Sequence, residues 1–296
     1  MFPPRHVFDV PLPGSGRLRL GDRPLVMGVL NVSPDSFADE PSAAGGPAAA
    51  IDRALRMVDE GADIIDIGGE SSRPGADAVT LEDERARVLP VVRGLAGRVP
   101  VPISVDTYKA GLARDVLAEG AAIINDISGL RYDAGMAAVV AAGSAALVIM
   151  HMRGRAKTMY AEAAYEDVVA EVTEELRERV AVASAAGVSR DRLILDPGLG
   201  FAKQAAHSYG ALARLAEFAA ALGRPLLVGP SRKSFLRDAV GGRPALERDW
   251  GTAAAVAAAV LGGAHIVRVH AVAEMAQVVR VTEQIRLHGM PQESHG

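Results

Sequence analysis

Short, nearly continuous apolar runs alternate with longer stretches of helical periodicity along this chain. The runs are rich in Val, Ile and Leu at consecutive positions, which is typical of strands buried on both faces of a parallel sheet. Eight such strands are predicted, at Leu25–Leu30, Ile64–Ile67, Ile103–Val105, Ala122–Ile124, Ala146–Met150, Leu193–Leu195, Leu226–Val228 and Ile266–Val269.

Helices are predicted between these strands. The clearest pattern is Tyr165, Val168, Val172 and Leu176, whose spacings of three and four form one apolar stripe. Glycines stand where several helices should end, as C-cap glycines would: Gly61, Gly120, Gly143, Gly187, Gly223 and Gly263. The predicted helices are Ala48–Glu60, Leu81–Ala96, Lys109–Glu119, Ala134–Ala142, Glu162–Ala186, Ser208–Leu222, Trp250–Leu261 and Val272–Leu287.

Eight strand–helix units within the length of one domain predict an α/β fold of the (β/α)8 TIM-barrel type. A doubly wound open sheet is the alternative, but eight units would make it unusually wide and no change in composition marks a second domain. Residues 7–20, with Pro-Gly-Ser-Gly in the middle, predict a β-hairpin. We therefore expect a hairpin over residues 1–20 that closes the barrel bottom, a barrel over residues 21–287, and a tail over residues 288–296.

Composition narrows the class of protein. The 296 residues carry a formal net charge of -4 and no basic cluster, which argues against a nucleic-acid partner. Cysteine is absent, so disulfides and thiolate metal sites are excluded. The first ten residues lack the apolar stretch of a signal peptide, and the longest nearly apolar segment, residues 253–264, is too short to span a bilayer. We expect a cytoplasmic enzyme without a membrane partner.

Polar clusters follow the C-terminal ends of the predicted strands, whereas the segments that enter the strands are bland. TIM-barrel enzymes place their chemistry at these C-terminal ends, so this asymmetry predicts an active site at that mouth of the barrel. The clusters are Asn31–Phe37, Asp66–Gly75, Asp106–Lys109, Asn125–Asp126, His151, Asp196–Lys203, Ser231–Ser234 and Arg268–His270.

Seven segments, in order and in register from about residue 24 to residue 285, resemble the signature of the dihydropteroate synthase family. They are Met27–Phe37, Gly61–Ser71, Asp106–Lys109, Ile123–Asp126, Asp196–Gly198, Ser231–Ser234 and Arg268–His270. The resemblance implies an enzyme of folate biosynthesis that joins (7,8-dihydropterin-6-yl)methyl diphosphate to 4-aminobenzoate and releases 7,8-dihydropteroate and diphosphate. It further implies Mg²⁺ as cofactor and a homodimer, for which the Ala/Gly-rich helix after the seventh strand is a candidate surface.

The pterin site is carried over from this resemblance. The edge of a pterin alternates hydrogen-bond donors and acceptors, and carboxylates and amides in a dry pocket would read it. The matching residues are Asp106, Asn125, Asp196, Lys233 and Arg268, and all of these except Asn125 are expected to be catalytic. The simpler interpretation is that the acids and the amide cap the following helices, which is the role we expect for Asp126.

A diphosphate needs fixed cations and hydroxyl donors. The resemblance assigns this role to Asn31, Ser72, Arg73, Arg268 and His270, with Asn31 also the single protein ligand of Mg²⁺. Alternation along the eighth strand points Arg268 and His270 in the same direction. The alternatives are a turn-forming asparagine and surface arginines in ordinary salt bridges.

The amine substrate needs a flat apolar slot, for which the resemblance offers Phe37, Pro74 and Phe201, with Ser234 facing its carboxylate. We expect the bond between the pterin methyl carbon and oxygen to break with the diphosphate stabilised electrostatically. Asp106 and Asp196 would support the positive charge that develops, and the neutral aniline nitrogen then attacks without a strong general base.

Two other activities remain open: a corrinoid-dependent pterin-binding methyltransferase and a catalytically idle pterin-binding paralogue. A dinucleotide site is set aside because Lys203 stands at the third glycine position of the motif that begins at Gly198. Two departures from the family pattern are notable. Ala271 stands where the family usually has Asp, and Ala202 where it has Gly.

Overall fold

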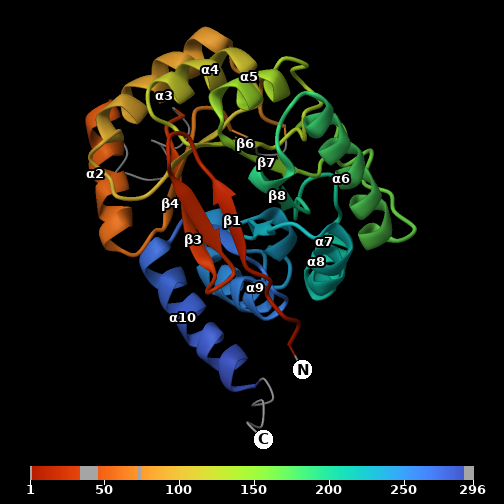
Figure 1. Cartoon of the computed structure of the whole chain (residues 1–296). Coiled ribbons are helices and arrows are strands. Elements are labelled where there is room, and N and C mark those ends of the chain that lie inside the picture. The colour runs from red at the N-terminus through yellow and green to blue at the C-terminus, as the bar shows by residue number, and fades with distance from the viewer. Residues whose placement is uncertain (1, 34–45, 72–74, 290–296) are drawn as a thin grey trace, which may run out of the picture.

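Eight parallel strands form a closed ring with helices around it, in a computed structural model that describes residues 2–33, 46–71 and 75–289 (Figure 1). The strands follow the order β8-β7-β6-β5-β4-β3-β10-β9, and an isolated bridge between Leu195 and Leu226 joins the two end strands. This confirms the predicted TIM barrel. The strands are β3 Leu25–Asn31, β4 Ile64–Gly68, β5 Ile103–Asp106, β6 Ile123–Asp126, β7 Ala146–Met150, β8 Leu193–Asp196, β9 Leu227–Val228 and β10 Ile266–Val269.

Several strands extend further than predicted because polar residues continue the ladder. Asp106 is the last residue of β5 and is paired in register with Asn125 of β6, while Asp196 of β8 is paired with Met150 of β7. A rule that ends a strand at its first polar residue misses such positions. Asp106, Asn125 and Asp196 therefore belong to the sheet and not to the loops that follow it.

The helices alternate with the strands as predicted, with two corrections. The helix predicted from Glu162 begins at Val168, because the side chain of Asp167 caps it there. The helix predicted over Ser208–Leu222 is two helices, separated where Arg214 leaves the helical conformation. The helices are α2 Gly46–Asp59, α3 Leu81–Leu95, α4 Ala110–Ala118, α5 Met136–Gly143, α6 Val168–Ala185, α7 Ala205–Ala213, α8 Leu215–Leu222, α9 Asp249–Leu261 and α10 Val272–His288.

Most of the predicted C-cap glycines follow their helices with positive φ, but Gly143 does not. It is the last residue of α5, and Ser144 takes the left-handed conformation with φ 56°. A Cβ on Gly143 would lie 2.8 Å from Cδ1 of Leu117 in α4. Close packing of the two helices therefore explains this glycine. The glycines with positive φ are Gly61, Gly120, Gly187, Gly223 and Gly263.

The predicted hairpin is present as strands β1, Phe8–Pro11, and β2, Arg17–Leu20. Its side chains Val10, Leu12, Leu18 and Leu20 pack in one cluster with apolar residues from the first half of the barrel strands. The hairpin thus covers the N-terminal end of the barrel, where the side chains inside the ring are apolar.

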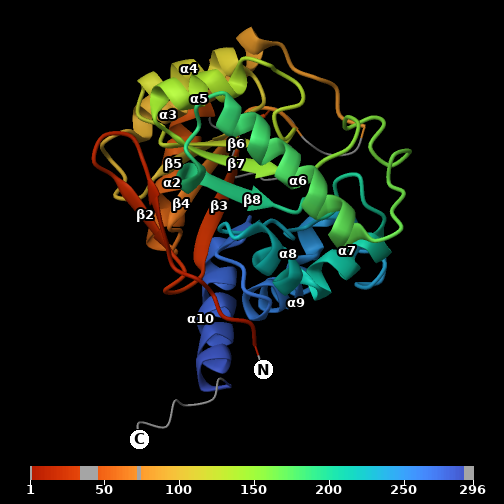
Figure 2. The ribbon, with the colours of Figure 1, turned by 45° about the vertical axis from the view of Figure 1, so that its right-hand side comes forward.

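A larger cluster lies between the outer face of the strands and the helices. In both views the helices surround the ring, and the N-terminal segment lies on the same side of the molecule as the end of α10 (Figures 1 and 2). None of the helices in the described ranges has both the length and the apolar character needed to cross a bilayer.

Candidate active site

Side chains inside the ring change from apolar to polar along four of the strands, β4, β6, β8 and β10. Alternate residues of a strand share one face, so a residue two positions after an inward-facing one also faces inward. The apolar cluster under the hairpin contains Ile64, Ile123, Ile194 and Ile266. Two positions further along the same strands are Asp66, Asn125, Asp196 and Arg268.

Arg268 is the centre of a network that joins four strands. Its Nε donates to Oδ2 of Asp66 at 2.6 Å, and its Nη2 donates to Oδ2 of Asp106 at 2.8 Å. The amide Nδ2 of Asn125 donates to the same Asp66 oxygen at 3.0 Å. Three of the residues expected to bind the pterin are therefore brought together by β5, β6 and β10, with Asp66 of β4 between them.

Asp66 was not among the expected site residues. It is fully buried, and its Oδ1 has no hydrogen-bond partner within the described part of the chain. A buried carboxylate that shares one oxygen between two donors can fix both of them. The signal was available in the sequence, because Asp66 has the inward orientation of Ile64 two residues earlier in the same strand.

Burial and charge set the ionisation of this network. Burial raises the pKa of Asp106 to about 7, although Arg268 opposes this effect, and the neighbouring Asp66 adds to it. Burial disfavours the charged form of Arg268, but the carboxylates of Asp66 and Asp106 outweigh it and raise the pKa of the guanidinium. Arg268 is therefore a fixed cation, whereas Asp106 can change its charge near neutral pH.

A second group of site residues gathers at the ends of β8 and β9. Oδ1 of Asp196 accepts from the backbone N–H of Gly198 at 2.7 Å, and burial raises the pKa of Asp196 while Lys233 opposes the shift. Burial lowers the pKa of Lys233 to about 8. Its Nζ donates to the carbonyl of Leu199 at 2.5 Å and lies 4.3 Å from the ring centroid of Phe201.

Gly229 connects the two groups. A Cβ on this glycine would lie 3.7 Å from Cβ of Arg268 and 3.8 Å from Nζ of Lys233. The Lys233 ammonium and the Cβ of Arg268 therefore both lie next to Gly229. The sequence prediction that Asp106, Asn125, Asp196, Lys233 and Arg268 meet at one mouth of the barrel agrees with this geometry.

The loop after β9 turns sharply to aim Lys233 at this mouth. Arg232 has φ 57°, a conformation that side chains other than glycine rarely adopt. Its backbone N–H donates to Oγ1 of Thr252, and its Nε donates to Asp249 at 2.8 Å. Arg232 is thereby anchored to α9, which leaves Lys233 as the residue of this pair that lies at the mouth.

His270 and Ser234 lie near the same loop. Nδ1 of His270 is 2.8 Å from Oγ of Ser231. Oγ of Ser234, at the start of the short 3-10 helix η3, Ser234–Leu236, is 2.9 Å from the hydroxyl oxygen of Tyr160. Phe201 is 8% exposed and packs in a small apolar cluster with Met150, Met152, Met159 and Ala202.

Comparison with known proteins accounts for this arrangement. A model of the family described as "Pterin binding enzyme" matches residues 27–270. Dihydropteroate synthase of Synechocystis sp. is 43% identical over 279 residues, which cover 94% of this chain and 96% of the relative. The chain belongs to the dihydropteroate synthase family.

Solved members of the family share the fold. The Burkholderia cenocepacia enzyme, complexed with 7,8-dihydropteroate, has a TM-score of 0.85 and 42% identity, covering 96% of this chain and 98% of that structure. The Xanthomonas albilineans enzyme with 4-aminobenzoic acid has a TM-score of 0.85 and 40% identity, covering 95% and 100%.

Four residues expected from the family resemblance lie outside the described residues: Phe37, Ser72, Arg73 and Pro74. Asn31 is the last residue of β3, paired with Gly68. A Cβ on Gly68 would lie 3.6 Å from Oδ1 of Asn31 and 3.9 Å from Oδ2 of Asp106. Among the described residues no group of three or more His, Asp or Glu side chains could hold a metal ion, so a cation at Asn31 would have to keep most of its waters.

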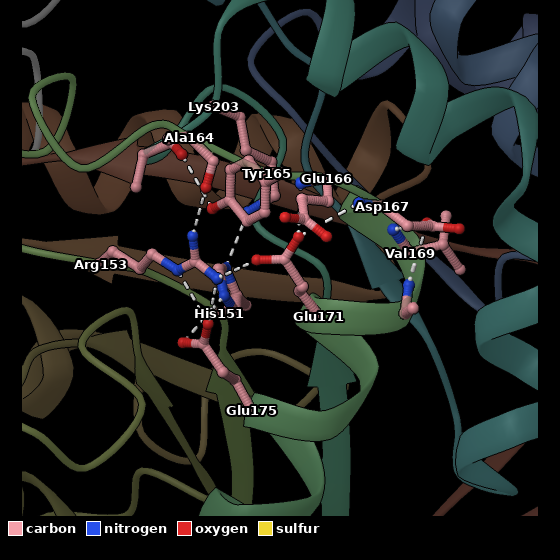
Figure 3. Close-up of polar contacts among 12 residues, drawn as sticks. His151, Arg153, Ala164, Tyr165, Glu166, Asp167, Val169, Glu171, Glu175 and Lys203 are labelled. Carbon is pink, nitrogen blue, oxygen red and sulfur yellow. Dashed lines mark hydrogen bonds and ion pairs between the residues drawn. The ribbon is translucent and has the colours of Figure 1, made fainter.

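A second polar network, which the sequence interpretation missed, includes Lys203, His151, Arg153 and Glu175 (Figure 3). Nζ of the buried Lys203 donates to Nδ1 of His151 at 2.8 Å and to the carbonyl of Phe201 at 3.2 Å. Burial lowers the pKa of Lys203 to about 7, and Asp196 opposes this shift. Burial and the Lys203 ammonium lower the pKa of His151 to about 3, so the imidazole is neutral.

This network continues to the surface of the protein. Nε2 of His151 lies 3.3 Å from Oε2 of Glu175 in α6, and Glu175 pairs with Arg153 at 2.6 Å. Figure 3 shows Arg153 between Glu171 and Glu175, with a further contact to the carbonyl of Ala164. Lys203 thus connects the backbone of Phe201 to the outer helix, and it supports the site from behind.

Proposed function

We propose that this chain joins (7,8-dihydropterin-6-yl)methyl diphosphate to 4-aminobenzoate at the polar mouth of the barrel and releases 7,8-dihydropteroate and diphosphate. Members of its family are transferases of the pteridinylmethyl group. The observation that carries the proposal is the meeting of Asp106, Asn125 and Arg268 inside the ring, beside Asp196 and Lys233. The relatives solved with 7,8-dihydropteroate and with 4-aminobenzoic acid support both substrates.

The pterin edge would be bound by the buried carboxylates and the amide. Ionised Asp106 and Asp196 accept hydrogen bonds from ring N–H groups, and the Asn125 amide both donates and accepts. Lys233 donates to an acceptor on the ring. Because these groups are mostly buried, a ring that fails to pair with them leaves unsatisfied polar atoms, and this gives selectivity for pterins.

The diphosphate would leave toward the cations of the mouth. Arg268 and His270 share the end of β10, and we assign Ser72 and Arg73 to the same role. The bond between the pterin methyl carbon and the diphosphate oxygen breaks, and the bonding electrons go to the diphosphate. Fixed cations that stabilise this developing charge lower the barrier of the step.

Mg²⁺, when bound through Asn31, would neutralise part of the diphosphate charge. The 4-aminobenzoate would lie against Phe201, with Phe37 and Pro74 completing the slot, and Ser234 would meet its carboxylate. The amine nitrogen forms the new C–N bond with its lone pair and then releases one proton. A neutral aniline needs no base before attack, so the mouth requires no general-base residue.

Diphosphate release tests the proposal. The purified protein with both substrates and Mg²⁺ should release one diphosphate for each pteroate formed. Asp196→Asn and Lys233→Ala should each lower kcat/KM by about 100-fold or more while the protein stays folded, because each removes a buried charge that contacts the pterin. Lys157→Ala, at an exposed lysine paired with Asp77, is the control and should match the wild type.

Each alternative gives a different result. An idle paralogue would bind pterin without releasing diphosphate, and a corrinoid-dependent methyltransferase would transfer a methyl group instead. Wild-type turnover with normal kcat/KM in both site variants would contradict the residue roles proposed above. The relatives described here are synthases, which favours the condensation.

We also propose a homodimer and a cytoplasmic location. Exposed apolar side chains on neighbouring elements support a contact between copies: Trp250 at the start of α9 is 89% exposed, and Val281 and Ile285 of α10 are 61% and 54% exposed. Light scattering should then give twice the 30.8 kDa of one chain. The absence of cysteine fits a reducing compartment, and cell fractionation would test the location.

A further inference from the structure

Tyr160 connects three loops at the mouth of the barrel. It belongs to the segment between β7 and α6, and its hydroxyl oxygen lies 2.9 Å from Oγ of Ser234, in the segment after β9. The same hydroxyl lies 3.4 Å from the carbonyl oxygen of Gly200, in the segment between β8 and α7. Its ring packs against the cluster that contains Phe201. Tyr160 therefore touches both described parts of the proposed amine site.

The hydroxyl pair has two possible proton arrangements. Serine and tyrosine hydroxyls each donate one hydrogen bond and accept others, whereas a backbone carbonyl only accepts. In one arrangement Ser234 donates to Tyr160, which donates to the more distant carbonyl of Gly200. In the other, Tyr160 donates to Ser234, and the Ser234 proton is directed elsewhere.

A carboxylate selects between these arrangements. An ionised carboxylate only accepts hydrogen bonds, so it needs Ser234 as a donor. When Tyr160 donates to Oγ of Ser234, the serine proton is free for the anion, and the two hydrogen bonds polarise each other in the same direction. A neutral ligand gains less from this arrangement, because hydrogen bonds to charged groups are the stronger ones.

We infer that Tyr160 is a specificity-determining residue for the amine substrate: through Ser234 it favours anilines that carry an anionic group opposite the amino group. The inference rests on the proposed function, since it assumes that the amine lies between Phe201 and Ser234. Tyr160 acts through another residue, so it is a positioning residue. Its ring packing would persist without the hydroxyl.

The variant Tyr160→Phe removes only the hydroxyl. The KM for 4-aminobenzoate should rise about fivefold, the effect of losing one hydrogen bond of typical net strength. The KM for the pterin diphosphate and the kcat should stay unchanged. The apparent affinity for 4-aminobenzamide, the neutral analogue, should also stay unchanged, whether it acts as a substrate or as a competitive inhibitor.

Tyr209→Phe is the matched control. This tyrosine of α7 is 39% exposed and its hydroxyl makes no hydrogen bond to the described residues, so its variant should match the wild type in every constant. In a Ser234→Ala background, Tyr160→Phe should add no further rise in the KM for 4-aminobenzoate, because the residue that it positions is gone.

Three results would overturn the inference: an unchanged KM for 4-aminobenzoate in Tyr160→Phe, an equal loss for the benzoate and the benzamide, or full additivity with Ser234→Ala. The second would mean that Tyr160 acts through packing alone. A wild-type protein that releases no diphosphate with 4-aminobenzoate would instead contradict the proposed function. Far-UV circular dichroism confirms that each variant is folded.

Discussion

Asp66 and Asp106 place two carboxylates around one guanidinium in the interior of the barrel. The side chain of Asp66 is fully buried, that of Asp106 is 12% exposed, and Arg268 donates to both. Burial raises the pKa of Asp106 to about 7 and the neighbouring Asp66 adds to this shift, while Arg268 opposes it without cancelling it. An acid whose pKa is raised by folding lowers stability wherever it is ionised, so this group serves binding at the expense of stability.

The variant Asp106→Asn tests that balance. Folded wild-type protein keeps the Asp106 proton up to a pH of about 7, whereas the ordinary value is 3.8. The folded state therefore binds more protons than the unfolded state between these values, and the stability contribution falls as the pH rises from about 4 to about 7. Asparagine does not titrate, so at pH 8 the variant should be more stable by at least about 1 kcal/mol, or roughly 3 °C in Tm.

Thermal unfolding at pH 4.5 and at pH 8 measures this effect. The difference in Tm between variant and wild type should be larger at pH 8, whereas kcat/KM should fall. Asp115→Asn, in a half-buried pair with Arg85 that is far less buried than Asp106, is the control and should show no comparable gain at pH 8. A Tm below that of the wild type at pH 8 would mean that the pair with Arg268 outweighs the cost of burial.

At the residue scale, the site residues that could be predicted from the sequence are those whose direction follows from the alternation of side chains along a strand. Asp106, Asn125 and Arg268 are inward-facing strand residues, so their convergence follows from the barrel alone. Lys203, His151 and Tyr160 are different, because their contacts depend on the paths of loops, and loop paths have no periodic signal. Lys203 and His151 were found in the sequence as members of the polar clusters at the strand ends, but their contact with each other was not predicted.

At the scale of elements, the start of α6 shows how one side chain sets a helix boundary. Oδ1 of Asp167 accepts from the backbone N–H groups of Val169 at 2.9 Å and Ala170 at 3.2 Å, and it pairs with Arg214 at the break between α7 and α8. The apolar periodicity predicted a start at Glu162, because a repeat of apolar residues does not show which polar residue caps the helix. By contrast, Ala271 begins α10 without a side-chain cap.

The variant Asp167→Ala should lower the free energy of unfolding by about 1 kcal/mol, the usual effect of losing a helix N-cap. Urea unfolding followed by circular dichroism measures this change. Glu166→Ala removes the neighbouring acid, whose side chain makes no hydrogen bond to the described residues, and it should have little effect. Equal effects of both substitutions would show that loss of negative charge, and not loss of the cap, is responsible.

At the scale of the whole molecule, the barrel separates stability from chemistry along its axis. The hairpin and the apolar layer fill one end, and the ionisable network fills the other. Near the hairpin end, Arg5 ties the N-terminal segment to α10. Its Nη1 and Nη2 donate to the two carboxylate oxygens of Glu283 at 2.8 and 2.9 Å, and both side chains are buried.

The variant Arg5→Ala should lower the free energy of unfolding by about 3 kcal/mol, because it leaves Glu283 buried without its main partner. Kinetic constants at a temperature well below the new Tm should not change, since the substitution lies at the opposite end from the site. Arg17→Ala, at an exposed position of the hairpin, should be neutral in thermal unfolding. A large change in kcat with unchanged stability would contradict this separation.

The overall topology was predictable because eight apolar runs in one domain leave few arrangements. How the ring closes between the first and last strands of the sheet order was not predictable from the sequence. The strand predicted over Leu226–Val228 contributes only two ladder residues, and Leu226 makes an isolated bridge to Leu195 of β8. Periodicity does not report how many hydrogen bonds a strand makes with each neighbour, so this seam is visible only in the structure.

The seam has a mechanical consequence. A cylinder held by continuous ladders resists opening everywhere, whereas this one has a narrow joint between β8 and β9. Asp196 is the last residue of β8, on one side of this joint, and Lys233 follows β9, on the other side. We expect thermal breathing of the ring to concentrate there. Because Asp196 and Lys233 lie on opposite sides of this joint, such motion would change the distance between these two groups.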